Sequence, residues 1–304
     1  GGVAEFSEKK RVKVESNRTG NVQFSFVAGQ YGFYNVNVAI IDIKSGEHLN
    51  KKSNMQVINA PENKNPRMGI ANHEFKNDEK MRLFRNMGMS YVREEISWDS
   101  FEREPGKYAL SEYSKKLLEG LSESDMKQIA IMAFSNPNVT DESPPVSDSA
   151  IEAYANYCKK AAEATRDYEP QFEIWNEYNM KGSFFNVSGA DEKSYVKMQK
   201  AAYTKIKEAA PDAVVYGLGG VTNVANFSEW IGNCFKEGAL DYCDAISIHP
   251  YEFYVNPEES GSINNINEVK TLLEKYNEPD KEILASEFGW GSDTVGEIAQ
   301  AQYT

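Results

Sequence analysis

Short apolar runs alternate with amphipathic helical segments from Met68 onward, and this alternation constrains the fold more than any other feature of the chain. Parallel strands need a crossover connection, usually a helix, between them. The pattern predicts seven such strands, beginning at Met68, Tyr91, Gln128, Phe172, Val214, Ala245 and Glu282. It therefore predicts an α/β protein of the (β/α)8 TIM-barrel type that lacks the eighth βα unit, as a C-terminally truncated barrel would.

Two helices between these strands have clear start and stop signals. Ser147 or Asp148 caps a helix that runs to about Arg166, and Asp191 caps another that ends before Pro211. Apolar residues recur at three- and four-residue spacing in the second helix, so we expect this stripe to face the strands. Its members are Tyr195, Met198, Ala202, Ile206 and Ala209.

The N-terminal segment, residues 1–64, has a different pattern. Polar and apolar residues alternate there, which predicts strands that form a β-sandwich-like domain or part of one. The predicted strands are 11–15, 22–27, 34–41 and 55–58. A polar segment with two prolines, 59–66, follows and predicts a linker. We therefore place the domains at 1–64 and 65–304, the second being the barrel.

Composition excludes several classes of partner. The chain has 33 Lys+Arg against 46 Asp+Glu, a formal net charge of −13, so we expect no binding to nucleic acid. No apolar run reaches the roughly 20 residues of a spanning helix, so we expect no membrane insertion. Three cysteines are predicted to be buried thiols. Four Asn-x-Ser/Thr sequons weakly favour a secreted or cell-surface location, and nothing indicates an oligomeric state.

Two glutamates lie just past apolar strands, where a parallel barrel places its reactive groups. They are Glu177, preceded by Asn176, and Glu287, 110 residues further along (287 − 177). Glycosidic cleavage with retained configuration needs one carboxyl to protonate the leaving oxygen and a second one to attack the sugar carbon. Arg93 ends the second strand and is the cation expected to keep one carboxylate ionised, although it could instead pair with Glu94 or Glu95.

Four motifs occur in the order found in one group of glycosidases. They are Val92-Arg93 followed by Trp98, then Trp175-Asn176-Glu177, then Ser247-Ile248-His249-Pro250-Tyr251, and finally Ser286-Glu287-Phe288-Gly289-Trp290. In these motifs the chain resembles clan A of the glycoside hydrolases, and is most similar to family 39 and its relatives.

The resemblance implies a retaining glycosidase that cleaves a poly- or oligosaccharide by double displacement. It implies that Glu177 is the general acid/base and Glu287 the nucleophile. It also implies that Tyr251 hydrogen-bonds the nucleophile and that His249 lines the sugar site. The alternative for His249 is a core histidine without a functional role.

Further substrate-binding candidates follow the predicted strand ends. The Asn176 amide can hold a sugar hydroxyl, and His73 ends the first strand. The aromatic candidates for stacking on sugar rings are Trp98 and Trp290 first, then Tyr178, Phe184, Phe185, Phe253 and Tyr254. With three histidines and no His-Glu-x-x-His string, we expect no catalytic metal, and we expect no cofactor.

Two other functions compete with glycosidase activity. A non-catalytic carbohydrate-binding protein would fit an incomplete barrel, because binding tolerates looser geometry than catalysis. A barrel aldolase or lyase would need a Schiff-base lysine or a metal site at a strand end, and the sequence shows neither.

Overall fold

The computed structural model describes residues 6–16, 18–57, 63–72, 78–256, 258–259 and 261–303. Contacts divide the chain into two compact units, Gly1–Glu62 and Asn63–Thr304. The predicted domain boundary after residue 64 lies two residues from this division. The two units are described separately below.

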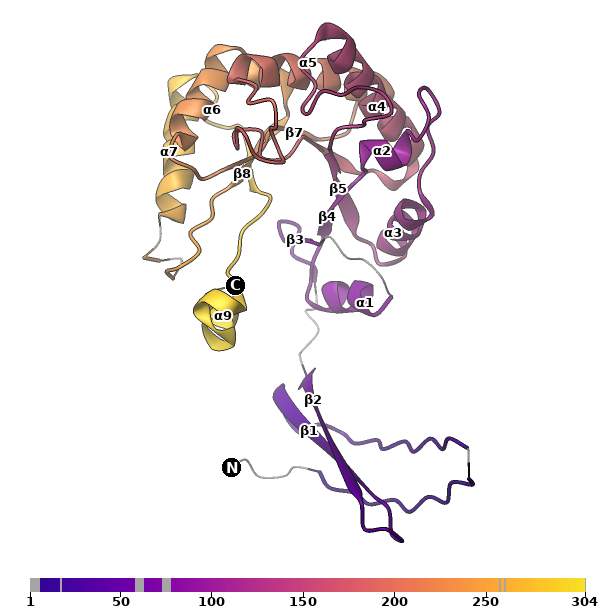
Figure 1. The fold of residues 1–304 in the computed structure, drawn as a ribbon. Helices are drawn as coiled ribbons and strands as arrows, with labels where there is room; N and C mark the ends of the chain where they lie inside the picture. The colour runs from indigo at the N-terminus through magenta and orange to yellow at the C-terminus, as the bar shows by residue number, and fades with distance from the viewer. Residues whose placement is uncertain are drawn as a thin grey trace. The chain divides into compact units, whose positions relative to one another are not determined.

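The second unit is built on one parallel sheet of seven strands in the described residues, in the order β3-β4-β5-β6-β7-β8-β9. Each strand lies beside its sequence neighbour, and helices cover the outer face of the curled sheet (Figure 1). The strands are β3 Gly69–Ala71, β4 Tyr91–Glu95, β5 Lys127–Met132, β6 Gln171–Ile174, β7 Val215–Thr222, β8 Ala245–His249 and β9 Ile283–Ala285. The predicted strands and the TIM-barrel-type fold are thus confirmed.

Helices and 3-10 turns connect the strands of this sheet. The longer helices are α1 Asp78–Asn86, α3 Glu112–Glu123, α4 Asp148–Thr165, α5 Glu192–Ala209, α6 Phe227–Lys236 and α7 Ser262–Lys275. The shorter segments are α2 Trp98–Phe101, η1 Arg166–Tyr168, η2 Ala239–Tyr242, α8 Ser292–Val295 and α9 Glu297–Tyr303. Among the described residues, no helix combines the length and the apolar composition needed to cross a bilayer.

The predicted helix caps explain where α4 and α5 begin. The Ser147 hydroxyl accepts a hydrogen bond from the Ala150 amide, and the Asp191 carboxylate accepts one from the Ser194 amide. Each contact satisfies one of the amides that a helix leaves unpaired in its first turn.

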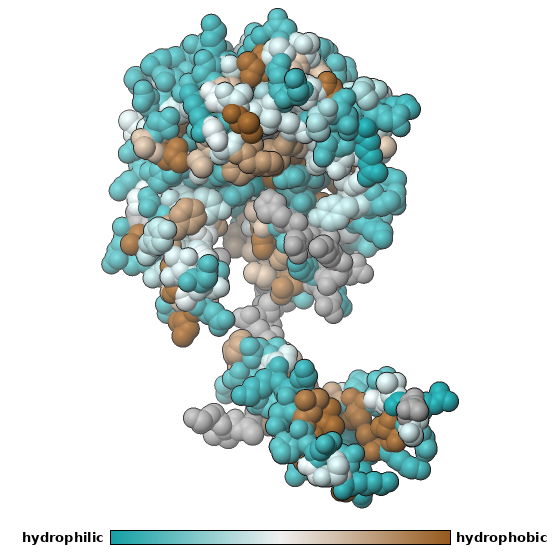
Figure 2. Space-filling model, viewed as in Figure 1, coloured by the Kyte–Doolittle hydropathy of each residue, from teal (hydrophilic) through white to brown (hydrophobic). Residues whose placement is uncertain are grey.

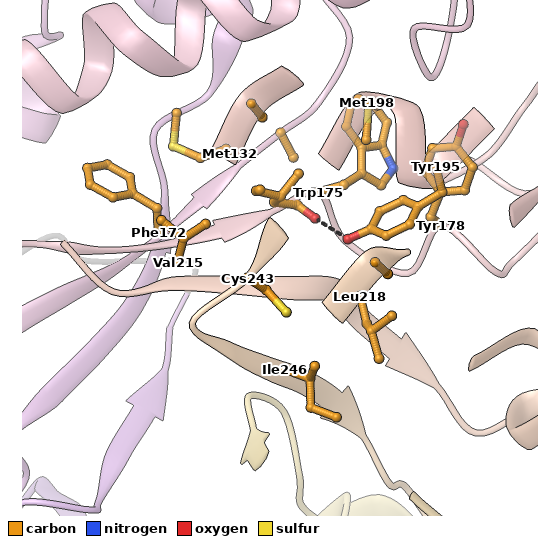
Figure 3. Packing of buried hydrophobic residues seen from close by; sticks show 14 of the residues in the cluster. Met132, Phe172, Trp175, Tyr178, Tyr195, Met198, Val215, Leu218, Cys243 and Ile246 are labelled. Carbon is orange, nitrogen blue, oxygen red and sulfur yellow. Dashed lines mark hydrogen bonds between the residues drawn. The ribbon is translucent and has the colours of Figure 1, made fainter. Parts of the chain in front are cut away.

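The core lies between the sheet and the helices α4 to α7. Four of the five predicted stripe residues of α5, Tyr195, Met198, Ala202 and Ile206, are fully buried, and Ala209 packs at the edge. Figure 3 shows the rings of Trp175, Tyr178 and Tyr195 together in this layer. The Tyr195 hydroxyl donates to the Ile174 carbonyl at 3.2 Å, which joins α5 to the end of β6.

The N-terminal unit does not form the predicted sandwich. Its described residues contain one two-stranded antiparallel sheet, β1 Gly32–Ile41 with β2 His48–Val57. The predicted strands 11–15 and 22–27 are not strands in this structure. Figure 2 shows apolar side chains gathered on the surface of this unit. Its exposed apolar residues include Phe24, Val38 and Ile40. Alternation predicts a strand only where a neighbour supplies hydrogen bonds, and a sandwich needs a second sheet to cover the apolar face.

The segment Gly217-Leu218-Gly219-Gly220 is not a tight turn, although its three glycines would favour one. It lies inside β7, where the pairing with β8 shifts register between Gly217 and Val221. Leu218, Gly219 and Gly220 have φ of 69°, 55° and 56°, in the left-handed region. These residues form an irregularity within the strand, and glycine is favoured there because it has no Cβ to clash.

Gly220→Ala should displace the His249 ring, because an added Cβ would lie 2.2 Å from Nε2 of that ring. Together with the left-handed backbone, this clash is expected to cost about 2 to 4 kcal/mol of folding free energy. Denaturant unfolding would measure it. The matched control is Gly232→Ala on α6, whose Cβ would meet only Leu272 at 3.7 Å and should leave stability equal or higher. Equal stability in both variants would contradict the close approach.

Glu94 is a buried carboxylate on the helix-facing side of β4. Burial, together with the charge of Glu95, raises its pKa to about 7, although hydrogen bonds from the Glu95 backbone and Tyr113 and the charge of Arg93 act to lower it. Its Oε2 has no hydrogen-bond partner among the described residues. The folded protein therefore favours the protonated form of this group.

The free energy of unfolding should fall as Glu94 ionises. In the unfolded chain the carboxyl has its ordinary pKa of 4.5, so the destabilisation begins near that pH and is complete above about 7. Glu94→Gln stays neutral, so its melting temperature should fall less than that of the natural chain between about pH 5 and about pH 8. Exposed Glu123→Gln on α3 is the control. Parallel melting curves for Glu94→Gln and the natural chain would refute this.

Candidate active site

Polar side chains from four strands meet at the carboxyl ends of the sheet. Arg93 lies in β4, Asn176 and Glu177 directly follow β6, His249 ends β8, and Glu287 comes two residues after β9. All of these strands are parallel, so their carboxyl ends lie at one rim. The side chains that the sequence distributes over almost 200 positions therefore form one cluster.

Arg93 is the centre of this cluster and is only 2% exposed. Its guanidinium donates from Nε to Glu173 Oε2 at 2.5 Å, from Nη1 to Glu287 Oε1 at 2.6 Å and from Nη2 to Asn176 Oδ1 at 2.6 Å. Burial acts to lower the pKa of Arg93, but Glu173 and Glu287 raise it above its ordinary value. It therefore stays charged, and it does not form the alternative pair with Glu94 or Glu95.

Glu287 is held as a carboxylate. Burial acts to raise its pKa, but the His249 ring, the Arg93 guanidinium and the Tyr251 hydrogen bond lower it below its ordinary value. The Tyr251 hydroxyl donates to Glu287 Oε2 at 3.0 Å, the contact that the resemblance implies. Burial raises the pKa of Tyr251 itself, so this hydroxyl keeps its proton and remains a donor. Both oxygens of Glu287 thus accept hydrogen bonds that favour the ionised form.

Glu177 lies close to Glu287, beside the same histidine. Its Oε1 is 2.9 Å from His249 Nδ1, and that nitrogen is 3.7 Å from Glu287 Oε2. One oxygen of each carboxylate and the ring nitrogen all lie within 4.8 Å of one another. Two carboxyl groups in different environments therefore face one small volume.

Glu173 and Ser286 belong to the cluster although the sequence analysis did not select them. Glu173 is fully buried, and its Oε1 accepts from the Ser286 hydroxyl at 2.7 Å. Ser286 Oγ is also 3.1 Å from His249 Nε2. The available signal was a charged residue inside the apolar run of β6, where alternation turns it toward the barrel interior.

The group Glu177, His249 and Glu287 is also the one set of His, Cys, Asp and Glu side chains with metal-site spacing in the described part of the chain. Arg93 and Tyr251 already donate to the two oxygens of Glu287. A cation would compete with the buried guanidinium for the same carboxylate. The contacts of Glu287 with Arg93 and Tyr251 therefore disfavour a cation at this group.

Three of the predicted sugar-stacking rings are buried instead. Trp98 and Tyr178 have no exposed surface, and Trp290 is 5% exposed. Trp98 stacks on Tyr157 and donates from Nε1 to Glu102 Oε2 at 2.7 Å. The prediction is wrong for Trp98 and Tyr178 because apolar residues next to strand ends also fill the layer between sheet and helices. Trp290 is covered by Phe288 and Tyr303 instead.

Other aromatic residues near strand ends are exposed. Phe184 follows β6, and Phe253 and Tyr254 follow β8, with 67%, 49% and 81% of their surface exposed. Phe253 stacks on Tyr251 with ring centroids 4.7 Å apart, and Tyr251 contacts Glu287. These rings can meet a sugar. The predicted site residue His73 lies outside the described residues.

Comparison with solved structures places the second unit among the glycosidases in fold. A family 39 glycoside hydrolase from the gut symbiont Bacteroides cellulosilyticus WH2 superposes with a TM-score of 0.76 at 22% identity, over 90% of this chain. The chain spans 59% of that enzyme's length. Xylanase 10B from Thermotoga petrophila RKU-1 gives a TM-score of 0.52 at 16% identity, over 73% of this chain and 68% of the xylanase.

An endo-β-1,4-glucanase from Xanthomonas axonopodis pv. citri also gives a TM-score of 0.52, at 14% identity, over 76% of this chain and 75% of the glucanase. Identities this low show a common fold only. No curated protein sequence matches the chain.

Family membership comes from the sequence model that matches residues 50–303, which is most of the chain and contains every residue of the cluster described above. That model describes family 5, whereas the structure with the TM-score of 0.76 is a family 39 enzyme, so clan A is confirmed while the nearer likeness to family 39 is one of fold. The chain belongs to the cellulase family, glycosyl hydrolase family 5, of clan A.

Proposed function

We propose that this protein is a retaining glycosidase in which Glu287 is the nucleophile and Glu177 the general acid/base. The observation that carries the proposal is the approach of a Glu177 oxygen to a Glu287 oxygen within 4.8 Å. Retaining glycosidases hold their carboxyl groups about 5 to 5.5 Å apart, whereas inverting enzymes leave about 6.5 to 9.5 Å for a water molecule. The spacing supports attack by the carboxylate itself.

The two reaction steps follow from the two environments. Glu287, ionised beside Arg93, attacks the anomeric carbon while Glu177 donates its proton to the leaving oxygen, which breaks the glycosidic bond. Glu177, now a carboxylate, then takes a proton from water, and the resulting hydroxide displaces Glu287 from the sugar. Two inversions give net retention, and both carboxyl groups return to their starting state.

The substrate class is an O-linked poly- or oligosaccharide. One structure of similar fold, the xylanase, holds xylobiose. The exposed rings of Phe184, Phe253 and Tyr254 offer apolar faces for sugar rings, and Phe253 stacks on Tyr251, which contacts Glu287. The Asn176 amide oxygen is held by Arg93, so its NH2 group is the part that can meet a sugar hydroxyl.

A carbohydrate-binding protein without catalysis is less well supported. Binding alone does not require a buried guanidinium that holds one carboxylate ionised while a second carboxyl meets a histidine. Opposed environments of this kind are typical of an acid and a nucleophile with different protonation states.

Replacing either carboxylate should impair turnover, and the two variants should differ in how the loss depends on the substrate. Glu287→Ala should remove detectable activity on every aryl glycoside. Glu177→Gln should lower kcat/KM by about 10² to 10⁴-fold on a substrate with a poor leaving group and far less on one with an acidic phenol, which needs no proton. Screening aryl glycosides would identify the substrate, and NMR would show whether the first product keeps the anomeric configuration.

Two further measurements complete this test. A fluorinated sugar should label Glu287, which mass spectrometry of the peptide would identify. Glu104→Ala, an exposed carboxylate on the loop after α2, is the control and should leave turnover unchanged. Full activity in Glu287→Ala or an inverted first product would refute the roles.

Tyr251→Phe should shift the acidic limb of the pH profile. The variant loses a hydrogen bond that lowers the pKa of Glu287, so that pKa rises and the nucleophile is protonated at higher pH. The acidic limb of kcat/KM should move upward by about 1 pH unit. The control is Tyr276→Phe, which removes a hydrogen bond to the Gly232 carbonyl in α6. An unmoved acidic limb in Tyr251→Phe would contradict the assigned contact.

A further inference from the structure

Glu173 is a buried carboxylate that the two-step reaction does not use. It lies in β6, four residues before Glu177, and none of its surface is exposed. Its Oε2 accepts from Arg93 and its Oε1 accepts from Ser286. A charge this deep is costly unless every partner is in place, so its position between these two groups needs a reason beyond packing.

The contacts of Glu173 form the start of a chain of hydrogen bonds. Ser286 Oγ meets Glu173 Oε1 at 2.7 Å and His249 Nε2 at 3.1 Å. The other ring nitrogen, Nδ1, meets Glu177 Oε1 at 2.9 Å. The chain therefore runs from Arg93 through Glu173, Ser286 and His249 to the proposed acid.

Counting donors fixes the direction of each bond. Glu173 is ionised beside Arg93, so it only accepts, and the single hydroxyl proton of Ser286 must point at it. Ser286 Oγ can then only accept from the ring, which places a proton on His249 Nε2. In the neutral ring Nδ1 is left with a lone pair directed at Glu177.

We propose that Glu173 and Ser286 are positioning residues that hold the neutral His249 ring in the tautomer with hydrogen on Nε2, and so keep a proton on the Glu177–His249 pair. The catalytic meaning of this inference rests on the proposed function. The tautomer itself does not.

The tautomer matters because of what happens when the pair loses its proton. A Glu177 carboxylate would then face the Nδ1 lone pair at 2.9 Å, two acceptors without a hydrogen between them. The pair therefore retains one proton, either on Glu177 or on Nδ1, to higher pH than it would with the opposite tautomer. That proton is the one the leaving oxygen needs.

The other charged or titratable groups around the pair are already assigned. Glu287 faces Nδ1 from the end of β9, Tyr251 lies beside the ring after β8, and Arg93 lies behind Glu173 in β4. Tyr251 donates to Glu287, and Arg93 forms ion pairs with both Glu173 and Glu287. Glu173 and Ser286 are thus the groups that reach Nε2.

Glu173→Gln should reverse the direction of these hydrogen bonds while the shape of the side chain stays the same. Arg93 Nε requires an acceptor, so the amide oxygen of the new side chain would face Arg93 and its NH2 group would face Ser286. Ser286 would then accept from the amide and donate its proton to His249 Nε2. The neutral ring would carry hydrogen on Nδ1 and donate to ionised Glu177.

Two readouts test the inference. Nitrogen-15 NMR should show the neutral His249 ring protonated on Nε2 in the natural chain and on Nδ1 in Glu173→Gln. The basic limb of kcat/KM should fall by about 1 pH unit in Glu173→Gln, since one hydrogen bond now favours the deprotonated acid. A merely structural role would lower kcat without moving this limb or the tautomer.

Matched variants keep the test decisive if Glu173→Gln does not fold. Ser286→Ala removes the acceptor for Nε2 and should also give hydrogen on Nδ1 and a lower basic limb, whereas Ser286→Thr keeps the hydroxyl and should restore both. Exposed Glu282→Gln is the control. A neutral His249 ring with its single hydrogen on Nδ1 in the natural chain, or an unchanged tautomer in Ser286→Ala, would overturn the inference. If the tautomers shift as expected but the protein cleaves no glycoside, the tautomer assignment is upheld and the proposed function is rejected.

Discussion

The buried guanidinium of Arg93 is the interaction on which the rest of the site depends. It contacts Glu173 in β6, Asn176 just after β6 and Glu287 after β9, so it joins strands that do not pair directly with β4. A buried cation without partners is costly, as is a buried carboxylate without a cation. Removing any one of these partners should therefore destabilise the folded barrel strongly. The polar cluster is thus part of what holds the fold together.

The same interaction gives two similar side chains different chemistry. Glu287 has Arg93 and Tyr251 as donors, and both favour its carboxylate form. Glu177 contacts the ring of His249. Unlike the guanidinium, this ring can share one proton with the carboxyl group of Glu177. The different neighbours of two identical functional groups are thus the basis of the different roles that we propose for them.

The sequence predicted the features that depend on local periodicity. It did not predict those that depend on partners distant in the sequence. Strand starts, the caps at Ser147 and Asp191 and the stripe of α5 follow from local spacing, and the structure has them. The prediction of a sandwich was wrong because residues 22–27 have the polar and apolar alternation of a strand but pair with no other strand among the described residues. The prediction for Trp98 was wrong because an indole after a strand can pack in the core or stack on a sugar. Only its tertiary contacts decide between the two. Glu173 was missed because its partners lie 80 and 113 residues away.

The backbone at the end of β6 explains how consecutive residues can serve one pocket. In a regular strand neighbouring side chains point to opposite faces, so Asn176 and Glu177 could not both face the sugar site. Trp175 and Glu177 adopt φ of 70° and 50°, and the Glu177 amide donates to the Gly219 carbonyl at 2.7 Å. A Cβ at Gly219 would lie 2.6 Å from the Ile174 carbonyl. The irregular segment of β7 is therefore what allows the strained turn that aims Glu177, and strain of this kind persists only where surrounding contacts determine it.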